Sequence, residues 1–458
     1  MKKLMMIGSA LLVLSSSAAF ASQARLLALG MNETDNEGMY YISDSRNIFL
    51  NPAYINVYSN LAEFEWGSAG QIATASAATT LPAATLNNNT SAPKAQGGVF
   101  KKYGDFVYGL YFGNESNTSS LLRVAGTAAG SALNGFTGAP GSGDSKMLQT
   151  ADNQVDLFFG GDNGIKWAVN PTIAIGKNEA RSSKDSAAAV RMGIIATNWD
   201  AHLNVSLASK SNSTDAVTVG AVGLADTIAQ DFKGKLGYHV GGSYILKGAN
   251  RVFGYVKHYG WEQTDRHLYT TTESNNIGGQ QGMVKGDFTN YYLGWGSEME
   301  VNKGDKLFAS LAAKKTDINL NFANKSEVRH LIIPLTLGYE AQATEWLILR
   351  GSVVQNLWGK SDNKNISNYG ATGTRLNKVA SGLVSKLYGN TGKTTIANST
   401  AVNAGATLVF GQLSIDGLIG TTNSNGASVV SATNSNAPKT GILSLSNLET
   451  SVAATYKF

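Results

Sequence analysis

Three features of the sequence predict an all-β fold, an antiparallel transmembrane β-barrel of about sixteen strands. Short segments in which apolar and polar residues alternate recur from residue 61 to the C-terminus. Beyond the first residues, no run approaches the ~18 consecutive apolar residues that a membrane helix requires. The connections between the alternating segments are long and short in turn, as in barrels with short turns on one side of a membrane and longer loops on the other. The 51 glycines and only seven prolines suit many short strands.

The N-terminus predicts export. Lys2 and Lys3 precede an apolar run over residues 4–14, and Ala19-Phe20-Ala21 has the form of an A-x-A cleavage site, so residues 1–21 are interpreted as a signal peptide. Its removal lowers a formal net charge that is only +5, which leaves too little positive charge to indicate a nucleic-acid partner. The predicted location is the cell outer membrane of a Gram-negative bacterium.

Residues 22–60 precede the first strand and are interpreted as a plug-like segment, because residues such as Leu26 and Phe49 make it too apolar for a solvated tail. The stretches Ala24-Arg25-Leu26-Leu27-Ala28-Leu29-Gly30 and Asp44-Ser45-Arg46-Asn47-Ile48-Phe49-Leu50-Asn51-Pro52-Ala53 resemble the start of the long-chain fatty-acid transporter family of outer membranes and its relatives. The resemblance implies a plug inside the barrel, with Asn51, Pro52 and Ala53 as its motif. It also implies fourteen strands, so fourteen stays open as an alternative to sixteen.

Residues 61–458 form the predicted barrel. The alternation places its strands near residues 61–69, 96–103, 105–113, 153–160, 165–176, 188–197, 200–209, 234–246, 251–262, 286–300, 305–316, 326–341, 345–357, 401–410, 412–420 and 446–458. Tight turns are predicted near Gly104, 161–164, 198–199, 247–250, 301–304, 342–344 and Gly411, and long loops at 70–95, 114–152, 210–233, 263–285, 358–400 and 421–445.

Alternation along each strand separates a lipid-facing set of side chains from a lumen-facing set. Leu203, Val205 and Leu207, for example, alternate with His202 and Asn204. The residues predicted to line the pore are Arg191, His202, Asn204, His239, His258, Asn290, Glu298, His330, Glu340 and Arg350.

The hairpin over residues 234–262 allows a register to be predicted. If residues 247–250 form its turn, the numbers of facing residues sum to 497. Tyr244 then faces Phe253 on the lipid side, and His239 faces His258 in the lumen.

The last strand ends at Phe458, with Tyr456 on the same face. A terminal phenylalanine that follows another aromatic residue by two positions resembles the signal read by the barrel-assembly machinery of outer membranes. Tyr456 and Phe458 are therefore interpreted as an assembly signal, and this machinery is a predicted partner.

The sequence offers little support for catalysis or for a cofactor. With no cysteine, it has no thiolate nucleophile and no cysteine-ligated zinc site, and it contains neither a G-x-S-x-G nor an H-E-x-x-H motif. Asp200 and His202 share a strand face and could form a proton-transfer pair, but they lie beside a predicted short turn. His239 and His258 lack a third ligand for a metal. No enzyme, cofactor or metal site is predicted.

Three functions are compatible with these features. The leading interpretation is a porin-like channel for small solutes, because its predicted lining mixes charges and amides. The first alternative is a plugged transporter of hydrophobic compounds such as fatty acids, with residues 22–60 as the plug. The second is a structural or adhesive surface barrel that works through loops 114–152 and 358–400. The remaining expected partner is outer-membrane lipid. The solute, the openness of the lumen and formation of a homo-oligomer stay open.

Overall fold

The computed structural model describes residues 23–31, 37–68, 95–114, 154–178, 183–219, 224–268, 280–321, 325–365, 391–395, 400–421 and 448–458. The predicted signal peptide, residues 1–21, lies outside these residues, as does most of each loop predicted at 70–95, 114–152, 358–400 and 421–445. The strands within the described ranges are β1 (Leu61–Ser68), β2 (Ala95–Tyr103), β3 (Phe106–Phe112), β4 (Gln154–Asp162), β5 (Lys166–Asn178), β6 (Ser183–Ile195), β7 (Trp199–Val219), β8 (Leu224–Gly234), β9 (Gly237–Ile245), β10 (Asn250–Leu268), β11 (Gln280–Asn302), β12 (Asp305–Asn321), β13 (Ser326–Thr344), β14 (Leu347–Lys364), β15 (Gly392–Thr395), β16 (Thr400–Phe410), β17 (Leu413–Thr421) and β18 (Leu448–Lys457).

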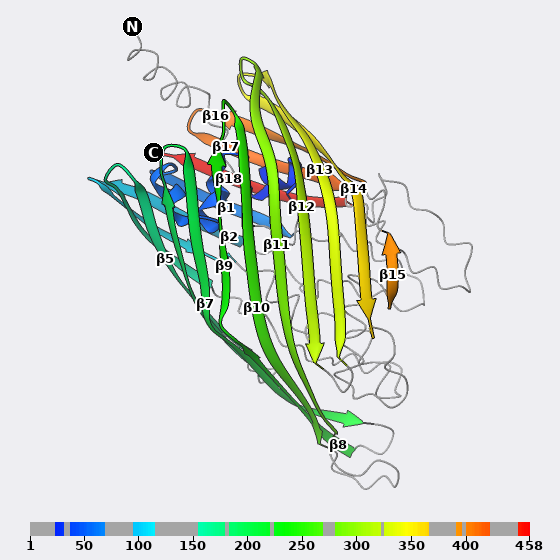
Figure 1. Cartoon of the computed structure of the whole chain (residues 1–458). Coiled ribbons are helices and arrows are strands. Elements are labelled where there is room, and N and C mark those ends of the chain that lie inside the picture. The colour runs from blue at the N-terminus through cyan, green and yellow to red at the C-terminus, as the bar shows by residue number, and fades with distance from the viewer. Residues whose placement is uncertain are drawn as a thin grey trace, which may run out of the picture.

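These strands close into an antiparallel barrel (Figure 1). Closure occurs at β1, where Leu61 faces both Phe100 of β2 and Lys457 of β18. Two positions in the ring are each filled by two strands in succession: β8 and β9 both lie between β7 and β10, and β15 and β16 both pair with β14. The described strands therefore occupy sixteen positions. The prediction of sixteen is confirmed, and the alternative of fourteen is wrong.

The two ends of the barrel differ in the length of their connections. At one end the strands are joined by tight turns, several of which contain a glycine with positive φ, such as Gly104 and Gly411. Toward the other end the strands run on, and β11 reaches 23 residues. Residues 210–219 and 224–233, expected in a loop, are strand, and so are 263–268 and 280–285. These stretches mix polar residues on both faces, so the alternation that reveals a half-buried strand is missing, while the backbone pairing continues.

The hairpin of β9 and β10 departs from its predicted register by one residue. Val252 faces Tyr244, so the numbers of facing residues sum to 496, because the turn has three residues, 247–249, with Gly248 at φ +64°. The shift leaves the side chains of β9 on the predicted faces and exchanges the two faces of β10. Phe253 points into the barrel, and His258 points outward, beside Thr289.

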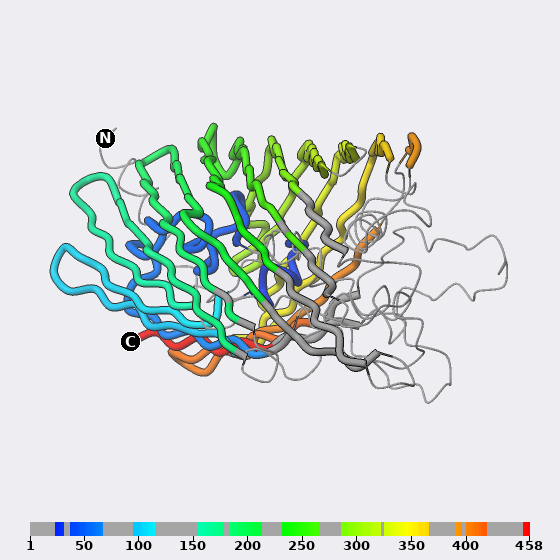
Figure 2. Tube along the Cα trace, turned by 90° about the horizontal axis from the view of Figure 1, so that it is seen from below, coloured from blue at the N-terminus to red at the C-terminus, as the bar shows by residue number. Residues whose placement is uncertain are grey.

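Residues of the N-terminal segment lie inside the barrel, as Figure 2 shows for the blue part of the chain. They form a short helix, α2 (Gln23–Ala28), and two 3-10 helices, η2 (Ser45–Phe49) and η3 (Pro52–Asn56). Pro52 lies in the first turn of η3, where proline is favoured. The Asn51 side chain caps this helix by accepting a hydrogen bond from the Ala53 N–H. None of the helices in the described ranges is long and apolar enough to cross a membrane.

Candidate functional site

The N-terminal segment touches strands all around the ring. Asn51 donates from Nδ2 to the carbonyl oxygens of Ile194 on β6 and Ala201 on β7, each at 3.2 Å. A Cβ placed on Gly193 would lie 1.8 Å from Oδ1 of Asn51, so the close approach requires glycine there. On the same side, Asn56 donates to the carbonyl oxygen of Trp167 on β5 at 3.0 Å. The motif asparagine therefore fixes one side of the segment to the barrel wall.

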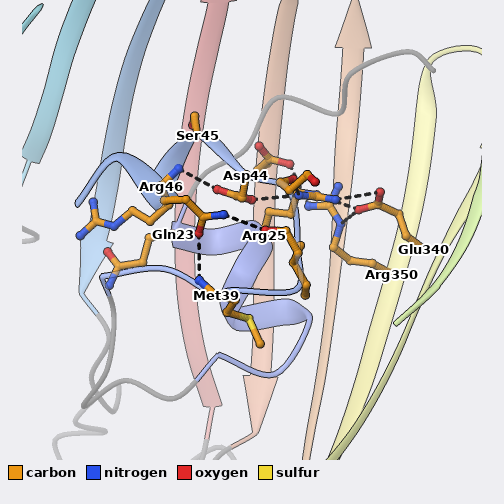
Figure 3. Close-up of polar contacts among 12 residues, drawn as sticks. Gln23, Arg25, Met39, Asp44, Ser45, Arg46, Glu340 and Arg350 are labelled. Carbon is orange, nitrogen blue, oxygen red and sulfur yellow. Dashed lines mark hydrogen bonds and ion pairs between the residues drawn. The ribbon is translucent and has the colours of Figure 1, made fainter. Parts of the chain in front are cut away.

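A buried chain of alternating charges fixes the opposite side (Figure 3). Arg25 lies 2.9 Å from Asp44 of its own segment and 2.9 Å from Glu340 of β13. Glu340 also lies 3.1 Å from Arg350 of β14, which in turn is 2.8 Å from Asp416 of β17. Each residue is at most 5% exposed. The five groups satisfy one another, and removing one would leave a buried charge uncompensated.

A second polar cluster joins the segment to β1. Ser45 donates to Glu63 at 2.8 Å, and the guanidinium of Arg46 lies 3.4 Å from Glu65. Arg46 also donates to Asn114, just after β3, at 2.6 Å. Glu63 and Glu65 point inward because they are two residues apart on one strand.

Aromatic and histidine side chains fill the space between the segment and strands β7, β9 and β10. Tyr40 stacks on Phe253 with ring centroids 5.3 Å apart, and the rings of His202 and His239 lie 4.7 Å apart. Glu37 lies 3.0 Å from Nδ1 of His239 and 3.3 Å from Nζ of Lys257. Burial alone would raise the pKa of Glu37, but the Lys257 ammonium and His239 hold that pKa well below its usual value. The carboxylate therefore stays ionised.

Farther toward the long-strand end, the interior face across β10 to β13 becomes apolar. Tyr259 faces Phe288, Phe288 faces Ile318, and Ile318 faces Val328, which makes one row across β10 to β13. Trp261 and Leu320 lie one row further on, and both are 1% exposed. The apolar interior patch is defined as Phe232, Tyr259, Trp261, Phe288, Ile318, Leu320 and Val328, all of which are buried.

The predicted pore-lining residues divide into two groups. Those whose side chains face the interior are Arg191, His202, Asn204, His239, Asn290, Glu298, His330, Glu340 and Arg350. Several of these contact the N-terminal segment directly: Asn204 donates to the carbonyl oxygen of Leu50, and Glu298 accepts from the Ser43 N–H. His258 was predicted wrongly, because the one-residue register shift turns it outward.

Asp200 and His202 do not form a proton-transfer pair. Ser243 donates to Asp200, and Arg251 lies 3.9 Å from it, whereas His202 lies 3.5 Å from the Tyr40 hydroxyl. Asp200 and His202 share the interior face but serve different partners. Sequence reasoning missed Arg25, Arg46 and Asp416 as parts of the site. The first two stood within the recognised motif stretches, and charges in an otherwise apolar segment that enters a barrel must find buried partners.

At the tight-turn end the C-terminus closes the ring. Phe458 donates its N–H to the carbonyl oxygen of Asn60, and its ring lies 6.4 Å from that of Tyr456 and 4.6 Å from Nζ of Lys101. Both aromatic rings are more than two-fifths exposed on the exterior. Their interpretation as an assembly signal stays a prediction, which the surface level of a chain lacking Phe458 would test.

Comparison with known proteins finds similar structures only. No protein-family model matches the chain, and no curated protein matches it. The toluene transporter TbuX of Ralstonia pickettii is 12% identical, with 96% of this chain and 99% of that chain covered and a TM-score of 0.37. A FadL homologue of Pseudomonas aeruginosa is 10% identical, with 96% and 98% covered and a TM-score of 0.41. The CymD monoaromatic hydrocarbon channel is 8% identical, with 97% and 99% covered and a TM-score of 0.38.

Proposed function

We propose that this protein is an outer-membrane barrel through which hydrophobic compounds pass, and that it is not an enzyme. The apolar interior patch carries the proposal. A porin has a polar, water-filled interior, because polar solutes that leave water need hydrogen-bonding partners. Here the interior toward the long strands presents Trp261, Phe288 and Ile318 instead. A compound that crosses at this level exchanges water for aromatic and aliphatic side chains, which favours apolar solutes.

The exterior supports the proposed location. Outward side chains near the tight-turn end are large and apolar, and Leu293 is 70% exposed and Leu337 47% exposed. Tyrosine and tryptophan, such as Trp295 and Tyr339, stand among them, as expected where a barrel wall meets lipid and its interfaces. The long strands extend beyond this belt on the side that carries long loops in outer-membrane barrels, which is the cell surface. The apolar interior patch thus lies on the side from which external compounds arrive.

A porin for small polar solutes is the second candidate. It is favoured by an interior row of Asn290, Thr316 and His330, which lies just below the apolar interior patch. The N-terminal segment weighs against it, because Arg25 and Asn51 tie that segment into the lumen from opposite sides. An adhesive or structural role would depend on the predicted loops 114–152 and 358–400, most of whose residues lie outside the described ranges, and it stays a prediction.

Uptake by proteoliposomes tests the proposal. Radiolabelled toluene is the hydrophobic probe, and arabinose, followed by liposome swelling, is the polar probe. The double variant Ile318→Asn/Val328→Asn places two amides in the apolar interior patch. We expect toluene uptake to fall about tenfold, since each lost apolar contact of this size is worth roughly 1–3 kcal/mol.

The matched control is His330→Asn, which changes an interior side chain in the neighbouring polar row without removing apolar surface. It should leave toluene uptake within a factor of two of the original chain. Rapid arabinose permeation by the original chain, together with toluene uptake that the double variant does not alter, would replace the proposal with the porin.

A further inference from the structure

The exterior of β11 to β14 changes from apolar to charged within three rows of facing residues. The rows, from the tight-turn end outward, are Leu293 with Ala313, then Tyr291 with Lys315, Leu331 and Lys360, then Thr289 with Asp317, Arg329 and Asp362. The first row suits acyl chains and the third suits water. The middle row therefore lies where lipid headgroups meet the barrel, on the cell-surface side.

A groove of about 490 Å³ opens on this exterior face, and it is mostly apolar. Its lining includes Val240, Gly254, Val256, Tyr291, Leu293 and Lys315. Gly254 presents no side chain, so the wall is low there, beside the 70% exposed Leu293 that it faces on β11. One cation stands in the lining: Nζ of Lys315 lies 5.5 Å from the centroid of the Tyr291 ring and 2.6 Å from the carboxylate of Asp317.

We propose that this groove binds one acyl chain of a lipid A molecule of the outer leaflet, and that Lys315 and Lys360 hold its phosphates. The apolar lining accepts the chain, and the ammonium of Lys315 lies at the level of the headgroups. The proposal rests on the outer-membrane location given above but not on the transported compound.

Charge complementarity selects a lipid with more than one phosphate. Lys315 and Lys360 stand in one row on either side of Leu331, two strand spacings apart, or about 9.5 Å between backbones. Within the described ranges Lys360 has no acidic partner, so its charge is available to an anion. Arg329, in the next row, adds a third exposed cation, although Glu327 lies 3.4 Å from it. A lipid with a single phosphate could engage only one of the two lysines.

Retention of lipid by purified full-length protein tests the site. The protein is placed in nanodiscs of phosphatidylcholine doped with di-phosphorylated lipid A, and bound lipid A is measured by native mass spectrometry at several concentrations. We expect Lys315→Gln/Lys360→Gln to weaken binding roughly 30-fold, because a lysine near an anionic membrane surface contributes about fivefold. Ala313→Leu, which narrows the groove without changing charge, should weaken it about tenfold through lost apolar burial.

The matched control is Lys325→Gln/Lys364→Gln. These two lysines lie 3.0 and 3.2 Å from Glu327, farther from the apolar belt, so the same change in net charge should leave binding within a factor of two. If the control pair weakens binding of lipid A equally, binding depends on the overall charge of the surface and not on Lys315 and Lys360, which would overturn the proposal. Equal retention of dephosphorylated lipid A, or of phosphatidylglycerol in its place, would also overturn it. Because the readout is bound lipid, the result is independent of whether toluene or arabinose crosses the barrel.

Discussion

The exteriors of the two halves of the barrel wall differ in polarity. Near the tight turns, the exterior carries Leu337 and Tyr339, while Glu340 and Arg350 face the interior. Near the long strands, the exterior carries pairs such as Asp317 and Arg329, while the interior carries the apolar interior patch. Side chains alternate between the two faces in both halves, so the reversal lies in the sequence alone. It indicates that lipid surrounds the first half and water surrounds the second.

The interiors of the two halves also differ in what they hold. The tight-turn half contains the N-terminal segment, which is joined to the wall by buried ion pairs through Arg25 and Arg46. Glu340, the partner of Arg25, faces Lys306, and the apolar interior patch begins twelve residues further along β12, at Ile318, or about 40 Å along a strand. Apolar contacts act together with these charges, since Tyr40 of the segment packs against Phe253 and Phe49 packs against Phe158.

The largest effect is expected from Arg25→Met. Asp44 and Glu340 would lose their shared guanidinium in a buried site, which costs about 3–5 kcal/mol when one partner of such a pair is removed. Limited proteolysis and denaturant unfolding should show release of the N-terminal segment at lower denaturant concentration. Lys166→Met is the control, because Lys166 pairs with Asp162 at the surface and should contribute less than about 1 kcal/mol. Equal effects of the two substitutions would contradict the account of the charge chain.

A charge placed on the exterior should distinguish the two halves. Leu337→Arg puts a guanidinium against lipid and should lower the free energy of unfolding in lipid vesicles by about 2–4 kcal/mol. Asn319→Arg, on the exterior of the long-strand half, should change it by less than about 0.5 kcal/mol. If both substitutions lower the free energy of unfolding by the same amount, the lipid does not end where the polarity of the exterior reverses.

Glu37 should give a smaller, pH-dependent effect. Its pKa is lower in the folded chain than in an unfolded one, so protonation opposes folding. The contact with Lys257 and His239 therefore stabilises the fold above the unfolded pKa near 4.3 and is lost as the pH falls through the lower, folded value. Glu37→Gln should cost about 2 kcal/mol at pH 7 and much less near pH 3. A cost that is independent of pH across this range would contradict the ionised contact.

The register of β9 and β10 can be tested by chemical labelling, which needs no measurement of stability. Both Tyr244 and His258 face outward. A single cysteine at Tyr244 should react with a lipid-soluble thiol reagent, and one at His258, which faces Thr289, with a water-soluble one. Cysteines at His239 and Phe253 should resist the lipid-soluble reagent because both side chains are buried inside the barrel. Lipid-phase labelling at position 253 and protection at position 258 would restore the register that the sequence alone predicted.

Sequence patterns predicted the strands well where a wall separates lipid from a polar interior. All sixteen positions in the ring were expected, because burial contrast between the two faces produces alternation there. The ends of the long strands were not expected, since residues 210–219 and 263–268 have polar residues on both faces. The register of one hairpin failed because it depended on whether the turn has three residues or four, and Gly248 decided that locally.

The candidate site was only partly predictable. Alternation gave the direction of nearly every interior residue, yet it could not tell which of them face water and which meet the N-terminal segment. Arg25 and Glu340, for example, are 315 residues apart in the chain, and Arg350 and Asp416 are 66 residues apart. The apolar interior patch was missed because strands that are apolar on the inside look like lipid-facing strands in the sequence.

Single-channel conductance of the purified protein in a planar bilayer tests the central division most directly. An N-terminal segment tied to the wall by Arg25 and Asn51, below an apolar interior, should give no steady ohmic current at neutral pH. Arg25→Met should then give intermittent openings as the segment loosens. A large, steady current from the original chain, unchanged by Arg25→Met, would mean that ions cross an open aqueous lumen, and it would contradict the account.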